Sequence, residues 1–381
     1  MNEVRALVEA FDAANVRGEQ CALATVVSVE GSSYRRPGAR MLVCEAGTGI
    51  GTTSTGTISA GCLESDVIEH AKRVIRTGEA KLVEYNTAST SDEMVWGLGL
   101  GCNGIVRVLV EPLASGSLSM EALRRSQAAS VSVATVYQCT SSDLARVGAR
   151  LVIQEEGNVS HENMSGKMAA RLENEVRAPS RGGMKSVKVF IETLLPPVPL
   201  IVFGAGQDAL PVVELARGLG WQTEVVDPQA RPASLSRFAV ADRVTLSRPE
   251  DVEAEVRITP RTMALLMSHN YVHDLTLLRF LLASPARYIG VLGPRKRTER
   301  MLKGLAMNEA ERARLHAPAG LDIGANGPAE IALSIVAEMR AVLDGRRGAM
   351  LRERRGSIHG NPGHNEGAAW AEERVLPWVA A

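Results

Sequence analysis

The chain has 381 residues, of which 45% are hydrophobic and 23% charged, a balance typical of a globular protein with two or three domains. Lys and Arg total 43, as do Asp and Glu, so the zero net charge creates no field that attracts nucleic acid or an anionic membrane. No apolar run reaches the roughly 18–20 residues that span a bilayer. The five cysteines lack CxxC spacing, which argues against a disulfide framework and a four-thiolate zinc site. With an acidic amphipathic start unlike a signal peptide, these features predict a reduced, soluble, cytoplasmic protein.

The first half of the sequence alternates short strands with helices. An apolar, β-branched strand ends at the turn GSSYRRPG, which carries Tyr34, Arg35 and Arg36, and a second strand follows. A stretch rich in Gly, Thr and Ser then leads into a helix that begins near Leu63 and ends at Gly78, with acidic residues early and basic residues late. The strands expected in this part are 21–30, 39–45, 81–87 and 104–112.

Three segments recur in the same order, which predicts a degenerate internal duplication. In one of the matches Cys62 stands opposite Arg171, and the loop GLGLGCNG around Cys102 has no counterpart with a thiol. We therefore interpret residues 1–196 as one α+β domain, whose first copy alone carries the glycine-flanked cysteines. The matching pairs are 24–43 with 134–153, 60–67 with 169–176, and 106–113 with 187–194.

The pattern changes after the stiff linker PPVP. Over residues 197–345 short apolar strands alternate with helices, as in a doubly wound parallel sheet of the Rossmann kind. Gly204 and Gly206 follow the first strand, where backbone N–H groups can meet a phosphate, and Asp227 ends the second, where it can take a ribose hydroxyl. Tight strand–helix packing explains the same glycines equally well. Residues 346–381, polar and Gly-rich, are expected to form a loosely ordered tail.

Polar motifs follow two later strands of this domain, where ligands of such sheets usually bind. In SHNYVHD, His269, His273 and Asp274 can bind a metal or move protons, the two histidines being one helical turn apart. Alternatively, His269 caps a helix or packs under a loop. In GPRKRTER, Arg295 and its basic neighbours can hold a phosphate or form a solvated helix start.

Two cysteines have surroundings that suit a reactive thiol. Cys62, in SAGCLE, comes at the start of a helix, whose N–H groups and dipole favour the thiolate. Cys102 lies among glycines that expose backbone donors. The alternatives are a small buried residue for Cys62 and an incidental thiol for Cys102. The remaining cysteines lie in strand patterns and are expected in the core: Cys21, Cys44 and Cys139.

These motifs resemble those of the XdhC/CoxI family, the accessory factors of xanthine dehydrogenase, carbon monoxide dehydrogenase and related molybdenum hydroxylases. GSSYRRPGARMLV, SAGCLE and LGLGCNGIVRVLVEP resemble its N-terminal domain, whereas LIVFGAGQDALPVVELARGLGWQTEVVD, SHNYVHD and YIGVLGPRKR resemble its C-terminal Rossmann domain. The resemblance spans most of residues 1–345, in the family's order. The chain departs from the family at Asn270, where relatives often have Asp, and at Pro294, where a serine is common.

The resemblance implies a maturation factor that binds the molybdenum cofactor, assists its sulfuration by a cysteine desulfurase, and assists its insertion into the apo-hydroxylase. Such a protein is a cofactor-binding chaperone rather than an enzyme, although whether it catalyses a reaction stays open. The alternative is an NAD(P)-dependent oxidoreductase that uses the Rossmann domain. A homodimer is a further expectation, whereas no nucleic acid or membrane is expected as a partner. The residues expected to bind the cofactor are Cys62, Cys102, Arg35, Arg36, Gly204, Gly206, Asp227, His269 and Arg295, with the two cysteines as contacts to molybdenum.

Overall fold

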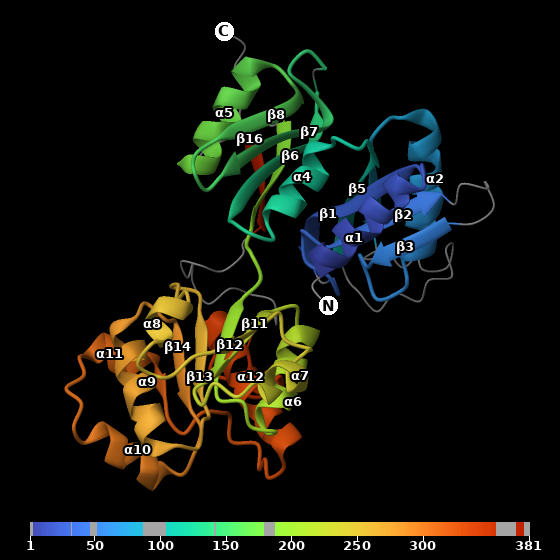
Figure 1. The fold of residues 1–381 in the computed structure, drawn as a ribbon. Coiled ribbons are helices and arrows are strands. Elements are labelled where there is room, and N and C mark those ends of the chain that lie inside the picture. The colour runs from blue at the N-terminus through green and yellow to red at the C-terminus, as the bar shows by residue number, and fades with distance from the viewer. Residues whose placement is uncertain are drawn as a thin grey trace. The chain divides into compact units, whose positions relative to one another are not determined.

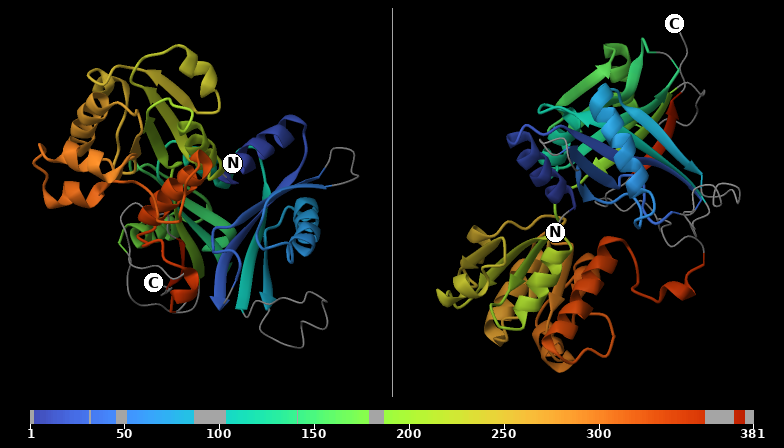
Figure 2. Two further views of the ribbon diagram at one scale, coloured as in Figure 1. Left: turned by 90° about the horizontal axis from the view of Figure 1, so that it is seen from below. Right: turned by 90° about the vertical axis from the view of Figure 1, so that its right-hand side faces the viewer.

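The chain forms two compact units (Figures 1 and 2). We call them the double-sheet unit, Glu3–Pro196 with Ala369–Ala381, and the Rossmann unit, which is mainly Pro197–Ala368. No helix in the described part of the chain is long and apolar enough to cross a membrane. The structure, a computed structural model, describes residues 3–31, 33–45, 52–86, 104–140, 142–178 and 187–355, and the backbone of 371–376.

The first copy within the double-sheet unit is an antiparallel sheet with helices on both faces. Its elements are α1 (Glu3–Val16), β1 (Cys21–Gly31), β2 (Arg40–Glu45), β3 (Thr52–Gly56), α2 (Glu64–Thr77), β4 (Lys81–Asn86) and β5 (Gly104–Leu113). The strand order is β3-β2-β1-β5-β4. One face of the sheet packs against α2 and the other against α1. The central strand β1 is therefore covered on both faces, which explains its continuous apolar run.

The second copy repeats the spatial order of these strands, and one of its edge strands comes from the C-terminal end of the chain. Its elements are α4 (Leu118–Arg125), β6 (Val131–Cys139), β7 (Ala145–Gln154), β8 (Val159–Met164), α5 (Gly166–Arg177), β9 (Val187–Leu194) and β16 (Ala371–Leu376). The strand order is β16-β9-β6-β7-β8, which matches the first copy strand for strand. Both central strands even carry a bulge at the same place, between Val26 and Ser28 in β1 and between Val136 and Gln138 in β6. The predicted duplication is confirmed.

Equivalent residues of the two copies meet in a shared core. Val27 and Tyr137 occupy matching positions in the central strands, as do Leu109 and Phe190 in β5 and β9, and the four side chains form one buried cluster. The copies therefore pack as two similar halves, each of which buries the same surface against the other.

The expected match of 60–67 with 169–176 is wrong in register. Residues 60–63 precede α2, whereas 169–176 lie wholly inside α5. The mismatch is about two helical turns, a shift that returns the same apolar positions to the same face and so leaves the hydrophobic pattern intact. Cys62 is therefore not the structural counterpart of Arg171.

The C-terminal segment also differs from the loosely ordered tail that its composition predicts. Residues 371–376 form β16, which pairs antiparallel with β9 (red in Figure 1). Without it β9 would be an edge strand with unpaired N–H and C=O groups. In the first copy β4 fills the same place beside β5. The Rossmann unit is therefore inserted in the chain between two strands of the second sheet.

The expectation that the core cysteines are unpaired is wrong for two of them. Cys21 and Cys44 are both buried, stand directly opposite each other in the β1–β2 ladder, and form a disulfide. Sequence spacing gave no sign of this pair because the strand register, and not the distance along the chain, brings the two Cβ atoms together.

The Rossmann unit has the doubly wound parallel sheet that the sequence predicts. The strand order is β12-β11-β10-β13-β14-β15, all parallel. α6 and α12 cover one face, and α8, α9 and α10 cover the other (Figure 1). The elements are β10 (Pro199–Phe203), α6 (Ala209–Gly218), β11 (Gln222–Asp227), α7 (Ala233–Arg237), β12 (Arg243–Leu246), α8 (Val252–Glu255), β13 (Met263–Leu266), α9 (Tyr271–Ala283), β14 (Tyr288–Val291), α10 (Arg295–Leu302), α11 (Glu309–Arg314), β15 (Leu315–His316), α12 (Pro328–Leu343) and the short η1 (Leu351–Glu353).

Candidate functional site

Two reciprocal ion pairs cross the junction between the copies of the double-sheet unit. Arg40 of the first copy bonds to Glu192 of the second, and Arg150 of the second bonds to Glu111 of the first, with 2.7 Å between Nη2 and Oε1. All four side chains are at most 10% exposed. Burial by itself lowers the pKa of Arg150, but Glu111 and neighbouring carboxylates raise it overall, so this guanidinium stays charged.

The repeated Gly-Ala-Arg motif explains why the pairs are reciprocal. Gly38 and Gly148 each precede the arginine by two residues and have φ values of 95° and 88°, a left-handed conformation that favours glycine. The Cβ position of Gly38 lies 3.4 Å from a carboxylate oxygen of Glu192. The motif therefore combines a glycine in the left-handed conformation with the arginine that binds the other copy's glutamate.

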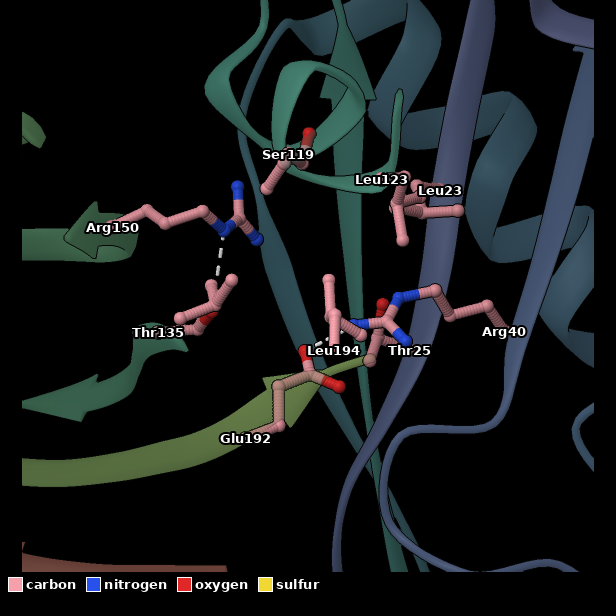
Figure 3. Close-up of a pocket in the computed structure, with 11 residues that line it drawn as sticks. Leu23, Thr25, Arg40, Ser119, Leu123, Thr135, Arg150, Glu192 and Leu194 are labelled. Carbon is pink, nitrogen blue, oxygen red and sulfur yellow. Dashed lines mark hydrogen bonds and ion pairs between the residues drawn. The ribbon is translucent and has the colours of Figure 1, made fainter. Parts of the chain in front are cut away.

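A small cavity lies beside these pairs (Figure 3). Arg40 and Glu192 contact each other on its wall, and Arg150 donates through Nε to the hydroxyl of Thr135, 3.2 Å away. Ser119, also on its wall, is buried and its hydroxyl has no hydrogen-bond partner. The charges here are already paired, so the cavity serves the junction of the copies and is not the candidate ligand site.

Cys62 lies in a tightly organised loop between β3 and α2. It is a free, half-buried thiol that packs against the sheet–α2 core, and the helix begins two residues later. The carboxylate of Glu64 closes the loop, because it accepts hydrogen bonds from the N–H groups of Ser59, at 2.8 Å, and Leu63, at 3.2 Å. Burial opposes ionisation of Glu64, but the Ser59 hydroxyl and these N–H groups lower its pKa overall. The cysteine is thus held in a fixed frame.

The loop of Cys62 is at the same end of the sheet as the flanks of the second cysteine motif. Tyr85, next to the last residue of β4, donates its hydroxyl to Asp66 in the first turn of α2, with 2.7 Å between the oxygens. Gly104, the last residue of GLGLGCNG, begins β5 and pairs with Gly31. Cys102 itself lies outside the described residues, so its expected meeting with Cys62 stays a prediction.

Arg35 and Arg36, both expected to bind the cofactor, have different surroundings in the turn between β1 and β2. Arg35 forms an ion pair with Glu3 of α1, with 2.5 Å between Nη2 and Oε2. Arg36 is exposed and presents its guanidinium to solvent. The chemistry available for an anion in this turn therefore rests on Arg36 rather than on Arg35.

In the Rossmann unit, two loops meet where the direction of strand order reverses, between β10 and β13. Gly204 has φ 139°, and a Cβ atom there would lie 2.4 Å from the carbonyl oxygen of Met267. His269, in the loop after β13, has φ 59°, which is unusual for a residue other than glycine. Its Nε2 lies 2.6 Å from Oδ2 of Asp208, which ends the glycine turn. Asp208 was not among the residues expected from the sequence, since nothing in a six-residue fingerprint indicates a partner 61 residues away.

Asp227 ends β11 as expected, but its carboxylate is engaged by its own chain. It is fully buried, and its carboxylate accepts hydrogen bonds from Ser234 Oγ, at 2.6 Å, and from the main chain and guanidinium of Arg231. Burial raises the pKa of Asp227, but these donors outweigh it and lower the pKa overall. The carboxylate closes the turn after β11 with donors from its own chain. The sequence correctly placed it at a strand end, and its expected contact with a ligand stays a prediction.

The polar residues after β13 and β14 have different surroundings in the structure. Asp274 is buried. Its Oδ1 accepts a hydrogen bond from Ser268 Oγ, 2.5 Å away, and its Oδ2 accepts one from Arg297 Nη2, 2.6 Å away. His269 precedes α9, where Asn270 is the N-cap, so His269 and His273 are not one turn apart on a helix. Arg295 is exposed at the start of α10. Among the residues that the structure describes, no group of three or more His, Cys, Asp or Glu side chains could hold a metal.

Comparisons with known proteins agree with the resemblance inferred from the motifs. The model of the XdhC and CoxI family matches residues 15–86, and that of the XdhC Rossmann domain matches 200–339. A probable xanthine dehydrogenase subunit of Bacillus subtilis is 33% identical over 326 residues, 84% of this chain and 92% of that protein. The molybdenum cofactor insertion chaperone PaoD of Escherichia coli is 23% identical over 328 residues, 85% of this chain and 84% of PaoD. A crystal structure described as a xanthine dehydrogenase, from Bacillus halodurans, is 32% identical with a TM-score of 0.74, over 90% of this chain and 97% of that one. The chain therefore belongs to the XdhC and CoxI family.

Proposed function

We propose that this protein is a maturation factor for a molybdenum hydroxylase, which binds the molybdenum cofactor and transfers it to the apoenzyme. Two relatives bear names that refer to xanthine dehydrogenase and to insertion of the molybdenum cofactor. The observation that carries the proposal is the frame around Cys62, in which Glu64 fixes a half-buried thiol beside the start of α2.

The residues of this region suit such a cofactor. When bound, the cofactor supplies a dithiolene-held molybdenum and a phosphate. A cysteine sulfur is the soft ligand that such a metal end prefers, and Cys62 is unpaired. Arg36, exposed in the turn between β1 and β2, would hold the anionic end. Cys102 is proposed as the second thiol of the same site.

The finer steps belong to the same proposal. We include assistance of sulfuration by a cysteine desulfurase, because a fixed thiol next to a held cofactor is suited to sulfur chemistry. A cytoplasmic location and a homodimer are kept as predictions. An apo-hydroxylase is the proposed recipient.

The NAD(P)-dependent alternative receives less support. A dinucleotide of the usual kind needs the acidic residue at the end of the second strand for its ribose. Asp227 occupies that place, but its oxygens are engaged by Ser234 and Arg231. Binding of NAD(P) would therefore require this turn to open first.

The test is to express the chain in cells with an intact cofactor pathway and to measure the molybdenum and pterin that co-purify. We expect both to be retained by the wild type and to be reduced at least about tenfold in Cys62→Ala, which removes a direct ligand. Cys139→Ala, in the second copy, is the matched control and should behave as the wild type. Full retention by Cys62→Ala would refute the thiol assignment, and absence of cofactor from the wild type would refute the function.

A further inference from the structure

The turn after β10 holds a histidine–carboxylate pair in place of an open anion site. Asp208 and His269 come from the loops after adjacent strands and meet at 2.6 Å. The His269 side chain is 58% exposed and that of Asp208 28% exposed, so the pair is accessible at the carboxyl ends of the central strands β10 and β13. His269 keeps a left-handed backbone to reach this position, and such strain is concentrated at functional sites.

Gly206 makes room for this pair. A Cβ atom at Gly206 would lie 2.3 Å from Oδ1 of Asp208 and 3.9 Å from Cδ2 of His269. In a phosphate-binding turn the glycine leaves that space for the ligand. Here the chain's own carboxylate fills it, and a carboxylate repels a phosphate through like charge.

The pair also fixes the hydrogen-bonding character of the imidazole. An ionised carboxylate can only accept, so Nε2 of His269 donates to Asp208. In the neutral ring Nδ1 then has no proton and accepts a hydrogen bond. In this neutral tautomer, Nδ1 is the ring atom that can accept a hydrogen bond from a ligand.

We propose that this turn recognises a neutral hydrogen-bond donor of its ligand, a hydroxyl or a ring N–H, through Nδ1 of His269, and that Asp208 excludes phosphate from the same place. Asp208 is a positioning residue, because it acts through the ring of His269. The inference goes beyond the proposed cofactor transfer and does not depend on it, since it concerns which chemical group the glycine turn accepts.

Removing only the negative charge of Asp208 should allow the turn to bind a phosphate group that the wild type excludes. Arg237 donates through Nη1 to the carbonyl oxygen of Ala205 in the same turn, at 2.8 Å. In Asp208→Asn, no carboxylate at this position offsets the positive charge of Arg237 or the positive end of the α6 dipole. We expect pyrophosphate, used as the probe at low salt, to bind this variant at least about tenfold more tightly than the wild type. Shifts of the backbone N–H signals of Gly206 and Ala209 report binding at the turn.

Glu214→Gln is the matched control. Glu214 is exposed on α6, the helix that Asp208 precedes, and the substitution changes the net charge by the same amount as Asp208→Asn. It should bind pyrophosphate as weakly as the wild type. Equal affinity of wild type and Asp208→Asn, including no binding by either, would overturn the proposal, as would an equal gain in Glu214→Gln. A second measurement needs no variant: the ¹⁵N shifts of His269 in the wild type should show a proton on Nε2 only. A proton on Nδ1, whether alone or in a doubly protonated ring, would overturn the recognition of a donor.

Discussion

Arg150 and Glu111 form a buried ion pair, with 2.7 Å between Nη2 and Oε1, that joins one copy of the duplicated module to the other. Its counterpart, Arg40 with Glu192, makes the same connection in the opposite direction. The two pairs lie at matching positions of the duplication, so the same sequence feature is used twice to join the copies.

Arg150→Met should destabilise the double-sheet unit by about 3–5 kcal/mol, because it leaves Glu111 buried without a partner. Removing both charges, in Arg150→Met with Glu111→Leu, should cost less than the single change. Arg5→Met, which breaks an ion pair more than half exposed, is the control and should cost less than about 1 kcal/mol. Urea unfolding measures all three, and a double variant less stable than Arg150→Met would contradict the explanation.

The Cys21–Cys44 disulfide should stabilise the protein by about 3 kcal/mol, since it closes a loop between residues 23 positions apart. Reductant should therefore lower the unfolding midpoint of the wild type but not that of Cys21→Ala with Cys44→Ala. Alkylation of the denatured, unreduced chain should label Cys62 and leave Cys21 and Cys44 unlabelled. Labelling of the latter two would show that the disulfide is absent from the purified protein.

Acid should loosen the loop of Cys62 through Glu64. The pKa of this carboxyl is lowered in the folded protein, so its contribution to stability is present above its unfolded value, about 4.3, and is lost as the pH falls through the folded value. The wild type should thus be more stable than Glu64→Gln at pH 7, with the difference shrinking below about pH 4. Thermal melts across this range measure it, and a difference that does not change with pH would count against the role given to Glu64.

Two glycines of the Rossmann unit should respond to alanine in opposite ways. Gly204→Ala places a Cβ atom 2.4 Å from the backbone of Met267 at a left-handed φ, and should cost at least about 1–3 kcal/mol. Gly218→Ala, at the end of α6 with open space around it, should instead be neutral or gain up to about 1 kcal/mol. Chemical denaturation compares them, and equal losses would mean that the close approach at Gly204 does not matter.

Local pattern was enough to predict the elements of the double-sheet unit and the Rossmann turn. The apolar runs of β1 and β10, the glycine at Gly204 and the repeated Gly-Ala-Arg are all visible within a few residues. The same locality caused an error, because the helix pattern around 60–67 repeats every few residues and allowed a match about two turns out of register.

By itself, then, the sequence determined the duplication, the parallel sheet and the family to which the chain belongs. Tertiary structure alone decided the partners: Cys44 for Cys21, Glu192 for Arg40, Asp208 for His269, and β16 for the edge of β9. Each of these contacts joins residues far apart in the chain, and is set by which strands lie side by side and by how they align. Spacing carries no record of such contacts, because a side chain's neighbours across a sheet depend on how the strands align and not on how many residues separate them.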